Sequence, residues 1–309
     1  MNSGVEILDQ RMVRARWRLI SFVELMKPEL TALSVLTALS GFYLAATSGI
    51  EFWPFLWTGV GTLLVGGGAG ALNQYVERDY DAMMRRTERR PLPSGRVSPP
   101  EVFWFGTILS FAGIALLALG TNLLTSFLGT VTITTYLFLY TPLKRITPFA
   151  TLVGGIPGAL PPMMGWAAAR NEISLPSVVL FAILFFWQIP HFHSLSWVYR
   201  KDYARAGFKM LTVQDSDGSR TSRQILLCVG LLLPASFGLT ILGVTGYLYL
   251  MGAAVLGIVF LTLGVMFAKA SGDSTSSAVA KCSLYSRRMF SASLVYLTAL
   301  MFLMVVDRV

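Results

Sequence analysis

The chain has 309 residues, of which 54% are hydrophobic and 13% are charged, with a formal net charge of +9. A soluble domain usually has about a quarter of its residues charged, so this composition excludes an ordinary water-soluble protein. Repeated apolar stretches of about 20 residues indicate membrane spans, which must be helical because lipid cannot satisfy open backbone groups. We expect nine spans, at about residues 29–48, 53–75, 101–119, 122–141, 149–168, 176–198, 224–243, 247–268 and 289–306.

The basic residues follow the positive-inside pattern. All Lys and Arg residues except Arg170 and Arg308 fall before the first span or in the loops after spans two, four, six and eight. This pattern predicts that the N-terminus and these loops are cytoplasmic and, with nine spans, that the C-terminus lies outside. The positive charge is therefore explained by topology and does not indicate a nucleic-acid partner. We expect a cytoplasmic segment over residues 1–28 and one transmembrane domain over residues 29–306.

The second span ends in a charged stretch, NQYVERDYDAMMRRTERRPLPSGR, over residues 73–96. Asn73, Glu77 and Asp81 are spaced four residues apart, which places them on one face of a helix. Magnesium takes carboxylate oxygens and often shares a site with phosphate oxygens of a substrate. We therefore predict that Glu77 and Asp81 bind metal, with Asn73 as an oxygen ligand or an orienting group. The alternative is a solvated loop whose charges pair with one another, and charge alone does not exclude it.

Cations stand close to these acids in the sequence. Guanidinium groups bind phosphate through two parallel hydrogen bonds, so the arginines that follow the acids are candidates for holding a diphosphate, in particular Arg86 and Arg90. Lys144 and Arg145 end the fourth span on the same side and are further candidates. Positive-inside topology explains Arg145 equally well.

A second charged stretch, YRKDYARAGFKML, ends the sixth span. Asp202 is a candidate for a second acidic metal site, and Tyr203 for a group that orients a phosphate or a carboxylate. Lys201 is another candidate for binding diphosphate, although topology alone also accounts for it. These stretches converge over a central cavity if the helices form a bundle.

These stretches together resemble the UbiA superfamily of intramembrane prenyltransferases. Residues 86–96, RTERRPLPSGR, resemble its RTxxRPLxxGR segment. Three longer stretches, residues 73–99, 140–166 and 187–213, are similar to the branch that farnesylates haem, and the similarity covers nearly all of the chain from about residue 20 to residue 306. The resemblance implies an all-α integral membrane protein, with nine transmembrane helices bundled around a central cavity.

The resemblance also implies a reaction. The farnesyl group of farnesyl diphosphate is transferred to the 2-vinyl group of haem B with Mg²⁺, and water adds, which gives haem O. Haem O serves some terminal oxidases directly or is converted to haem A, so haem A synthase or a terminal oxidase is an implied partner. The short N-terminal region favours a bacterial inner membrane over a mitochondrial one.

Two departures from the wider superfamily bear on the acceptor. Relatives that prenylate aromatic rings carry Asp directly after the first-motif Asn, whereas this chain has Gln74, and they carry a further Asp in the second motif, whereas here ARAGF follows Asp202. The haem branch shares both departures, which favours haem over the alternative, an aromatic quinone precursor or a chlorin. They leave the number of metal ions open.

Two histidines, His191 and His193, lie in WQIPHFHSL on the sixth span. Ionisable residues inside spans are often functional, and histidine is a common ligand of haem iron. His191 matches the PHF segment of the family and His193 does not match a usual position. Both are candidates for haem contact, and the alternative for each is a hydrogen bond inside the bundle.

Two rival classes are weighed against an enzyme. A transporter would place polar groups near the bilayer midplane and often shows internal repeats, whereas these acids gather at one end of the spans. An accessory subunit that only holds haem would not need the row of acids. Both comparisons favour a metal-dependent enzyme.

Overall fold

The computed structural model describes residues 17–47, 49–273 and 275–309, so residues 1–16 of the expected N-terminal segment lie outside the described residues. The described residues form helices and connecting loops, with one isolated bridge of extended backbone between Thr245 and Arg308. A short helical segment over residues 17–25 precedes the first long helix. The expected all-α fold is therefore confirmed.

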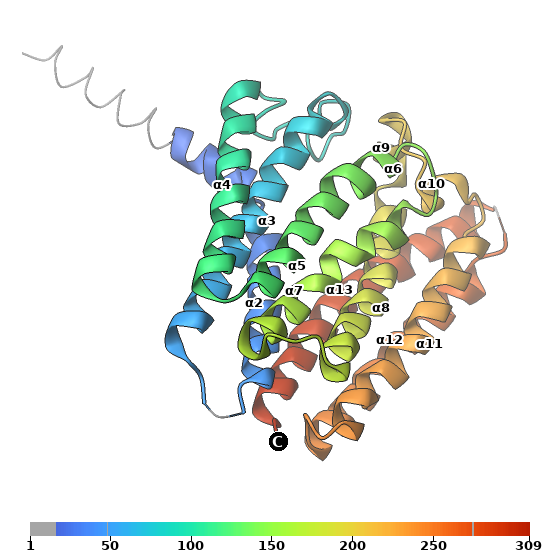
Figure 1. Cartoon of the computed structure of the whole chain (residues 1–309). Coiled ribbons are helices and arrows are strands. Elements are labelled where there is room, and N and C mark those ends of the chain that lie inside the picture. Colours follow the sequence, from blue (N-terminus) through green and yellow to red (C-terminus); the bar gives the residue numbers. More distant parts are fainter. Residues whose placement is uncertain (1–16, 48, 274) are drawn as a thin grey trace, which may run out of the picture.

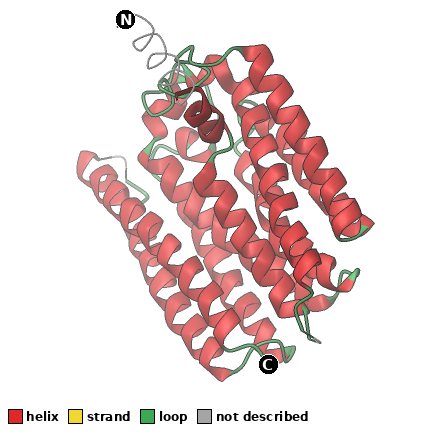
Figure 2. Cartoon of the chain, turned by 90° about the vertical axis from the view of Figure 1, so that its left-hand side faces the viewer, coloured by secondary structure: helices red, strands yellow, loops and turns green. Residues whose placement is uncertain are grey.

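Nine long helical stretches run alongside one another in the described ranges (Figures 1 and 2). They are α2 (Pro28–Ala45), α3 (Phe52–Asp81), α4 (Pro99–Gly120), α5 (Leu123–Thr134) with its continuation, α7 (Ala150–Arg170), α8 (Leu175–Val198), α11 (Ser219–Ile241), α12 (Tyr247–Ala270) and α13 (Ser276–Val306). Each corresponds to one expected span. The largest difference is in α13, which begins at Ser276 rather than near residue 289.

Of the nine described helical stretches, eight are long and apolar enough to cross a membrane. The exception is α7. Helix α7 is less apolar because it contains Pro157, Pro161 and Pro162 together with several glycines. Most of its residues are buried, among them all three prolines. Its neighbours therefore shield it from lipid, which explains why a helix of this composition is tolerated.

The helix after α4 changes its winding before it ends. Helix α5 passes into a π-helix, η1 (Thr135–Tyr140), and then into the short α6 (Thr141–Leu143). The Thr141 N–H donates to the Tyr136 carbonyl five residues earlier, and the Lys144 N–H returns to an α-helical bond with Tyr140. Such π segments are rare and often occur at functional sites.

Several loops and short helices gather at one end of the bundle, shown at the top of Figure 1, and the C-terminus lies at the other end. We call this the basic end, formed by residues 82–98, 144–149 and 199–218. It includes α9 (Arg200–Arg205) and α10 (Leu211–Gln214). The loop at residues 82–98 ends at α4. There the Ser98 N–H donates to the Glu101 carboxylate in a capping box, and Pro99 occupies the first position of the helix.

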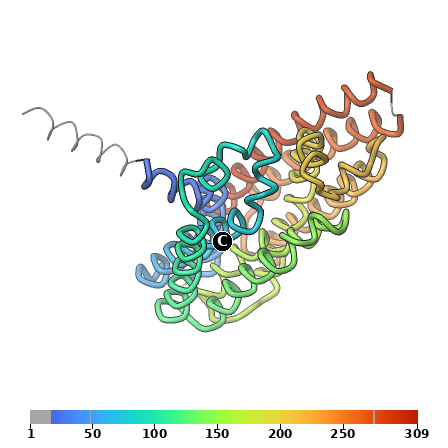
Figure 3. The backbone as a smooth tube through the Cα atoms, turned by 90° about the horizontal axis from the view of Figure 1, so that it is seen from above, coloured from blue at the N-terminus to red at the C-terminus, as the bar shows by residue number. Residues whose placement is uncertain are grey.

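The helices pack closely through small residues. A Cβ atom on Gly165 of α7 would lie 1.7 Å from the Ala38 carbonyl oxygen of α2, and one on Gly41 would lie 2.0 Å from the Pro162 carbonyl oxygen. The two backbones therefore touch, as is common between membrane helices. Viewed from above, the early helices lie on one side and the late helices on the other (Figure 3).

The two basic residues at the opposite end both bind the carboxyl end of α2. Arg170 donates to the Ala45 carbonyl at 2.7 Å, and Arg308 donates to the Ala46 carbonyl. These carbonyls have no further helical turn to bond to, so the arginines cap them. The two exceptions to the charge pattern thus have a structural role.

Candidate functional site

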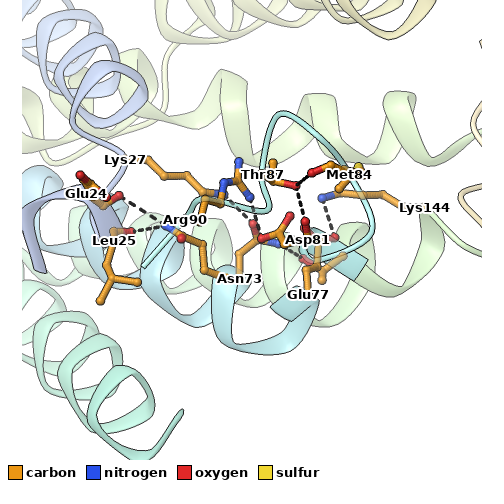
Figure 4. A network of polar contacts seen from close by, with 12 residues as sticks. Glu24, Leu25, Lys27, Asn73, Glu77, Asp81, Met84, Thr87, Arg90 and Lys144 are labelled. Atoms are coloured by element: carbon orange, nitrogen blue, oxygen red, sulfur yellow. Dashed lines mark hydrogen bonds and ion pairs between the residues drawn. The ribbon is translucent and has the colours of Figure 1, made fainter. Parts of the chain in front are cut away.

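Helix α3 continues to Asp81 and carries the three predicted site residues, Asn73, Glu77 and Asp81, on one face. Asn73, Glu77 and Asp81 are 1%, 7% and 1% exposed, respectively. The expected helical spacing is therefore confirmed, and the side chains project into the protein beneath the basic end (Figure 4). A solvated loop is excluded for this part of the stretch, because the acids are buried.

Each of these three residues has a cation beside it. Lys27 donates to Asn73 Oδ1 at 2.6 Å. Lys144 lies 2.8 Å from Glu77 Oε1, and Arg90 Nη1 lies 2.7 Å from Asp81 Oδ2. These three contacts appear together in Figure 4. Buried charges need such partners, because an unpaired carboxylate in a medium of low dielectric is strongly disfavoured.

The donor set fits a hard metal ion with a limited number of protein ligands. Asp81 Oδ1 is buried and has no hydrogen-bond partner among the described residues. No group of three His, Cys, Asp or Glu side chains that could hold a metal occurs in the described ranges. Asp202 Oδ1 lies 3.6 Å from Arg205 Nη1 of its own helix. An ion at Glu77 and Asp81 would therefore take further oxygens from substrate and water.

The basic end supplies Lys144 in a fixed position. Its ammonium lies 4.4 Å from the Tyr140 ring centroid, and its carbonyl accepts a hydrogen bond from the Lys209 N–H at 2.9 Å. Burial, the largest single influence, lowers the pKa of Lys144, but Glu77 together with Tyr140 and Tyr136 raises it, and the net direction is upward. Lys144 is therefore an ammonium cation at every physiological pH.

Aromatic rings hold two of the predicted arginines. The Arg86 guanidinium lies 4.5 Å from the Tyr203 ring centroid and 5.0 Å from that of Tyr199. Arg145 donates to the Tyr80 hydroxyl and lies over the same ring at 4.6 Å. These contacts hold the guanidinium groups in place without neutralising their charge.

An apolar cluster fastens the two charged stretches together. Buried Met84 packs with Ala206, Phe208 and Met210, and Tyr203 lies against this cluster. The stretches at residues 73–96 and 199–211 therefore converge, as the sequence suggested. Lys201 differs from the other candidates, because it is exposed and no ion pair, hydrogen bond or aromatic ring holds its side chain within the described part of the chain.

Sequence reasoning missed Lys27 and Tyr136. Lys27 precedes Pro28 at the start of α2 and adopts a left-handed conformation with φ 51°, and its ammonium also lies 3.4 Å from the Tyr136 hydroxyl. In the sequence alone, a single lysine before an apolar span indicates only the orientation of that span in the membrane. Its role becomes visible only when α2 and α3 are packed together.

The two histidines have protein partners. His191 Nδ1 lies 2.7 Å from Ser293 Oγ, and the ring stacks on Trp187 and packs against Phe290. His193 Nε2 lies 2.8 Å from Gln224 Oε1, and the residue is 1% exposed. His193 is thus accounted for by a hydrogen bond inside the bundle, whereas no hydrogen bond reaches His191 Nε2 from the residues described.

Comparisons with known proteins bear on this arrangement. The model of the UbiA prenyltransferase family matches residues 34–304. A protoheme IX farnesyltransferase from Solibacter usitatus is 43% identical over 296 residues, which cover 93% of this chain and 98% of that protein.

Solved structures share the fold. That of digeranylgeranylglyceryl phosphate synthase has a TM-score of 0.74 at 18% identity and covers 93% of this chain and 99% of that one. A UbiA homologue from Archaeoglobus fulgidus bound to GPP and Mg²⁺ has a TM-score of 0.63 at 13% identity, with 90% and 99% covered. With the family model matching most of its length and a close relative over nearly all of it, this chain belongs to the UbiA prenyltransferase family.

Proposed function

We propose that this protein transfers the farnesyl group of farnesyl diphosphate to the 2-vinyl group of haem B, with addition of water, and so makes haem O. The observation that carries the proposal is the buried row of Asn73, Glu77 and Asp81, each with a cation beside it. The name of the Solibacter relative supports haem as the acceptor. The Mg²⁺ and GPP named for the Archaeoglobus homologue support a metal and a prenyl diphosphate.

The cations at the basic end bind the diphosphate in this proposal. Lys144, Arg145 and Arg90 donate hydrogen bonds to its oxygens, and Arg86 and Lys201 are further candidates. When the allylic C–O bond breaks, its electron pair leaves with the diphosphate, and these fixed cations stabilise the added negative charge. Tyr203 keeps Arg86 in place through its ring.

The acids provide the metal site. Glu77 and Asp81 would hold Mg²⁺ through carboxylate oxygens, Asn73 would supply or orient an oxygen ligand, and Asp202 is the candidate for a second acidic site. Bound there, the ion would neutralise charge on the leaving diphosphate. Lys27 keeps the Asn73 amide oriented, because its ammonium already binds Oδ1.

The remaining step joins the two substrates. The π electrons of the vinyl group form the new C–C bond with the allylic cation, and the charge left next to the porphyrin is quenched by water, which then loses a proton. The buried site keeps bulk water away until the bond has formed. His191 is the proposed contact to haem through Nε2, and His193 is a weaker candidate.

The chain is a multi-pass membrane protein, and we propose its orientation. The basic end with the N-terminus faces the cytoplasm and the C-terminus lies outside, in a bacterial inner membrane. The product then passes to a haem A synthase or a terminal oxidase.

The test is an assay of the purified protein in detergent with haem B, farnesyl diphosphate and Mg²⁺. Extracted haems are analysed by mass spectrometry, with an EDTA sample and the Asp81→Asn variant alongside. Haem O that disappears in both controls supports the proposal. Prenylation of a hydroxybenzoate instead of haem would favour the alternative, a UbiA-type enzyme with an aromatic acceptor.

A further inference from the structure

A cavity of about 450 Å³ opens beside the row of acids, and the mechanism above gives no role to Arg89, which lines it. It lies between residues 24–30, at the start of α2, and residues 86–91 of the following loop, with Gln74 of α3 in its wall. We call it the mouth pocket. Its volume falls within the range of about 300–1,000 Å³ that is typical of small-molecule sites.

The mouth pocket is cationic. Lys27, Arg86, Arg89 and Arg90 line it. Arg90 is neutralised by Asp81, but no carboxylate lies within ion-pair distance of the other three in the described ranges.

The two acids of the pocket do not cancel this charge. Glu24 is already bound to Arg96 at 2.5 Å. Glu29 lies in the first turn of α2, where a negative side chain offsets the positive end of the helix dipole. Anion-binding capacity therefore remains in the pocket, on Lys27, Arg86 and Arg89.

Two further features show that the pocket is built for a polar ligand. Helix α2 begins here without a side-chain cap, so the N–H groups of its first turn are available to an anion. Gln74 is 1% exposed, and its Nε2 donates to the Leu25 carbonyl at 3.1 Å. Its Oε1 has no hydrogen-bond partner in the part of the chain that the structure describes. A buried acceptor of this kind is normally satisfied by a ligand or a water.

The mouth pocket runs along the row formed by Asn73, Glu77 and Asp81, because its residues Lys27 and Arg90 contact the first and the last member of that row. Figure 4 shows Lys27 and Glu24 at one end and Lys144 at the other, with the α3 acids between them. Lys27 contacts Asn73, the first residue of the row, and Lys144 contacts Glu77, the second residue. Arg86 and Arg90 are thus shared with the proposed diphosphate cations, whereas Lys144 lies outside the pocket lining and Arg89 belongs to the pocket alone.

We propose that the mouth pocket binds the propionate carboxylates of haem, with Arg89 as the principal contact. This inference rests on the proposed function, in which haem is the second anionic substrate. Guanidinium binds carboxylate through two parallel hydrogen bonds, and Arg89 is exposed and unpaired by any acid in the described ranges. The propionates stand on the edge of the porphyrin opposite its vinyl groups. Anchoring them in the pocket therefore points the vinyl edge inward, away from the surface.

The test compares haem B with its dimethyl ester, which keeps the ring, the iron and the vinyl groups but lacks both carboxylates. Binding of each to the detergent-solubilised full chain is titrated by the Soret absorbance, and prenylation is followed separately. The variants are Arg89→Gln and, as the matched control, Arg287→Gln, an exposed arginine in the first half of α13. Comparing variants in the same detergent cancels the different partitioning of the two haems.

The wild-type protein and the Arg287→Gln variant should bind the diacid at least about tenfold more tightly than the ester, which corresponds to about 1.4 kcal/mol. Arg89→Gln should remove most of this preference by weakening diacid binding alone, with the KM for farnesyl diphosphate unchanged. Equal binding of both haems by the wild type, or a raised KM for farnesyl diphosphate in Arg89→Gln, would overturn the inference. A retained binding preference without haem O formation would count against the proposed function and leave the pocket assignment standing.

Discussion

The Lys144 ammonium lies 2.8 Å from Glu77 Oε1, and neither side chain is more than 10% exposed. Removing one partner leaves a buried charge without compensation, which costs about 3–5 kcal/mol. We therefore expect Lys144→Met to lower the unfolding temperature strongly and to abolish prenyl transfer.

The double variant Lys144→Met, Glu77→Gln separates the two effects. It should recover most of the stability, since no buried charge remains, but no activity. Thermal unfolding in detergent and the haem O assay measure the two quantities. If the double variant were as unstable as the single one, the pair would not be the cause of the loss.

The same pair predicts how stability depends on pH. The pKa of Lys144 is lowered by burial but raised by Glu77 together with Tyr140 and Tyr136, so it lies above its ordinary 10.5. A group whose pKa is raised by folding stabilises the protein fully below its unfolded pKa, and this stabilisation is lost as pH rises through the folded value. The unfolding temperature should therefore be insensitive to this group between about pH 7 and 9 and should fall above about pH 10.5. The fall should be steeper in the wild type than in the double variant, and equal slopes would contradict the assignment.

The contact of Arg86 with Tyr203 predicts how firmly the loop at residues 82–98 is held. A cation over an aromatic ring contributes about 0.5–2 kcal/mol, depending on burial. Tyr203→Leu should therefore speed tryptic cleavage within this loop severalfold, whereas Tyr203→Phe, which keeps the ring, should be cleaved like the wild type. Cleavage at the same rate in all three proteins would show that the ring does not restrain the loop.

The contact between α2 and α7 predicts an unusually sensitive glycine. A Cβ at Gly165 would meet the Ala38 carbonyl oxygen, and the two backbones must separate to admit it. We expect Gly165→Ala to cost about 3 kcal/mol or more of stability. Gly230→Ala on α11 is the control, because nothing lies within 4 Å of the added atom there, and it should be neutral or slightly stabilising. Unfolding temperatures of the two variants in one detergent decide the point.

The two histidines should differ in their effect on haem. His191→Phe keeps the stacking on Trp187 but removes Nε2, the proposed contact to haem. Loss of this one polar contact should weaken binding of haem B about tenfold. His193→Gln keeps a polar group beside Gln224 and should leave haem binding unchanged. Soret titrations measure both. Unchanged binding in His191→Phe would assign this residue to packing alone.

Much of this arrangement follows from periodicity in the sequence. The long helices were predictable because a helix that crosses a bilayer must present an apolar run, as eight of the nine described ones do. The row of Asn73, Glu77 and Asp81 was predictable because a spacing of four fixes one helix face, whatever the helix packs against.

The partners of these residues were not predictable, because they come from other helices. The Lys27 contact with Asn73 joins residues 46 positions apart, and no local pattern specifies it. Asp202 was predicted as a second acidic site, and its contact with Arg205, one turn along α9, is a local one that the sequence did not single out. The early start of α13 was missed for a related reason, because its first turns are polar and do not resemble a span.

The π-helix η1 has a consequence for how the family's sequences are compared. Its turn bonds residues five apart and so holds one residue more than an α-turn. In an α-helix each residue turns the chain by about 100°. A single-residue deletion in Thr135–Tyr140 would swing Lys144 from Glu77 around to another side of the helix. The length of this segment is therefore itself required for the site. A gap there in a sequence alignment indicates a lost site, even where every catalytic residue is retained.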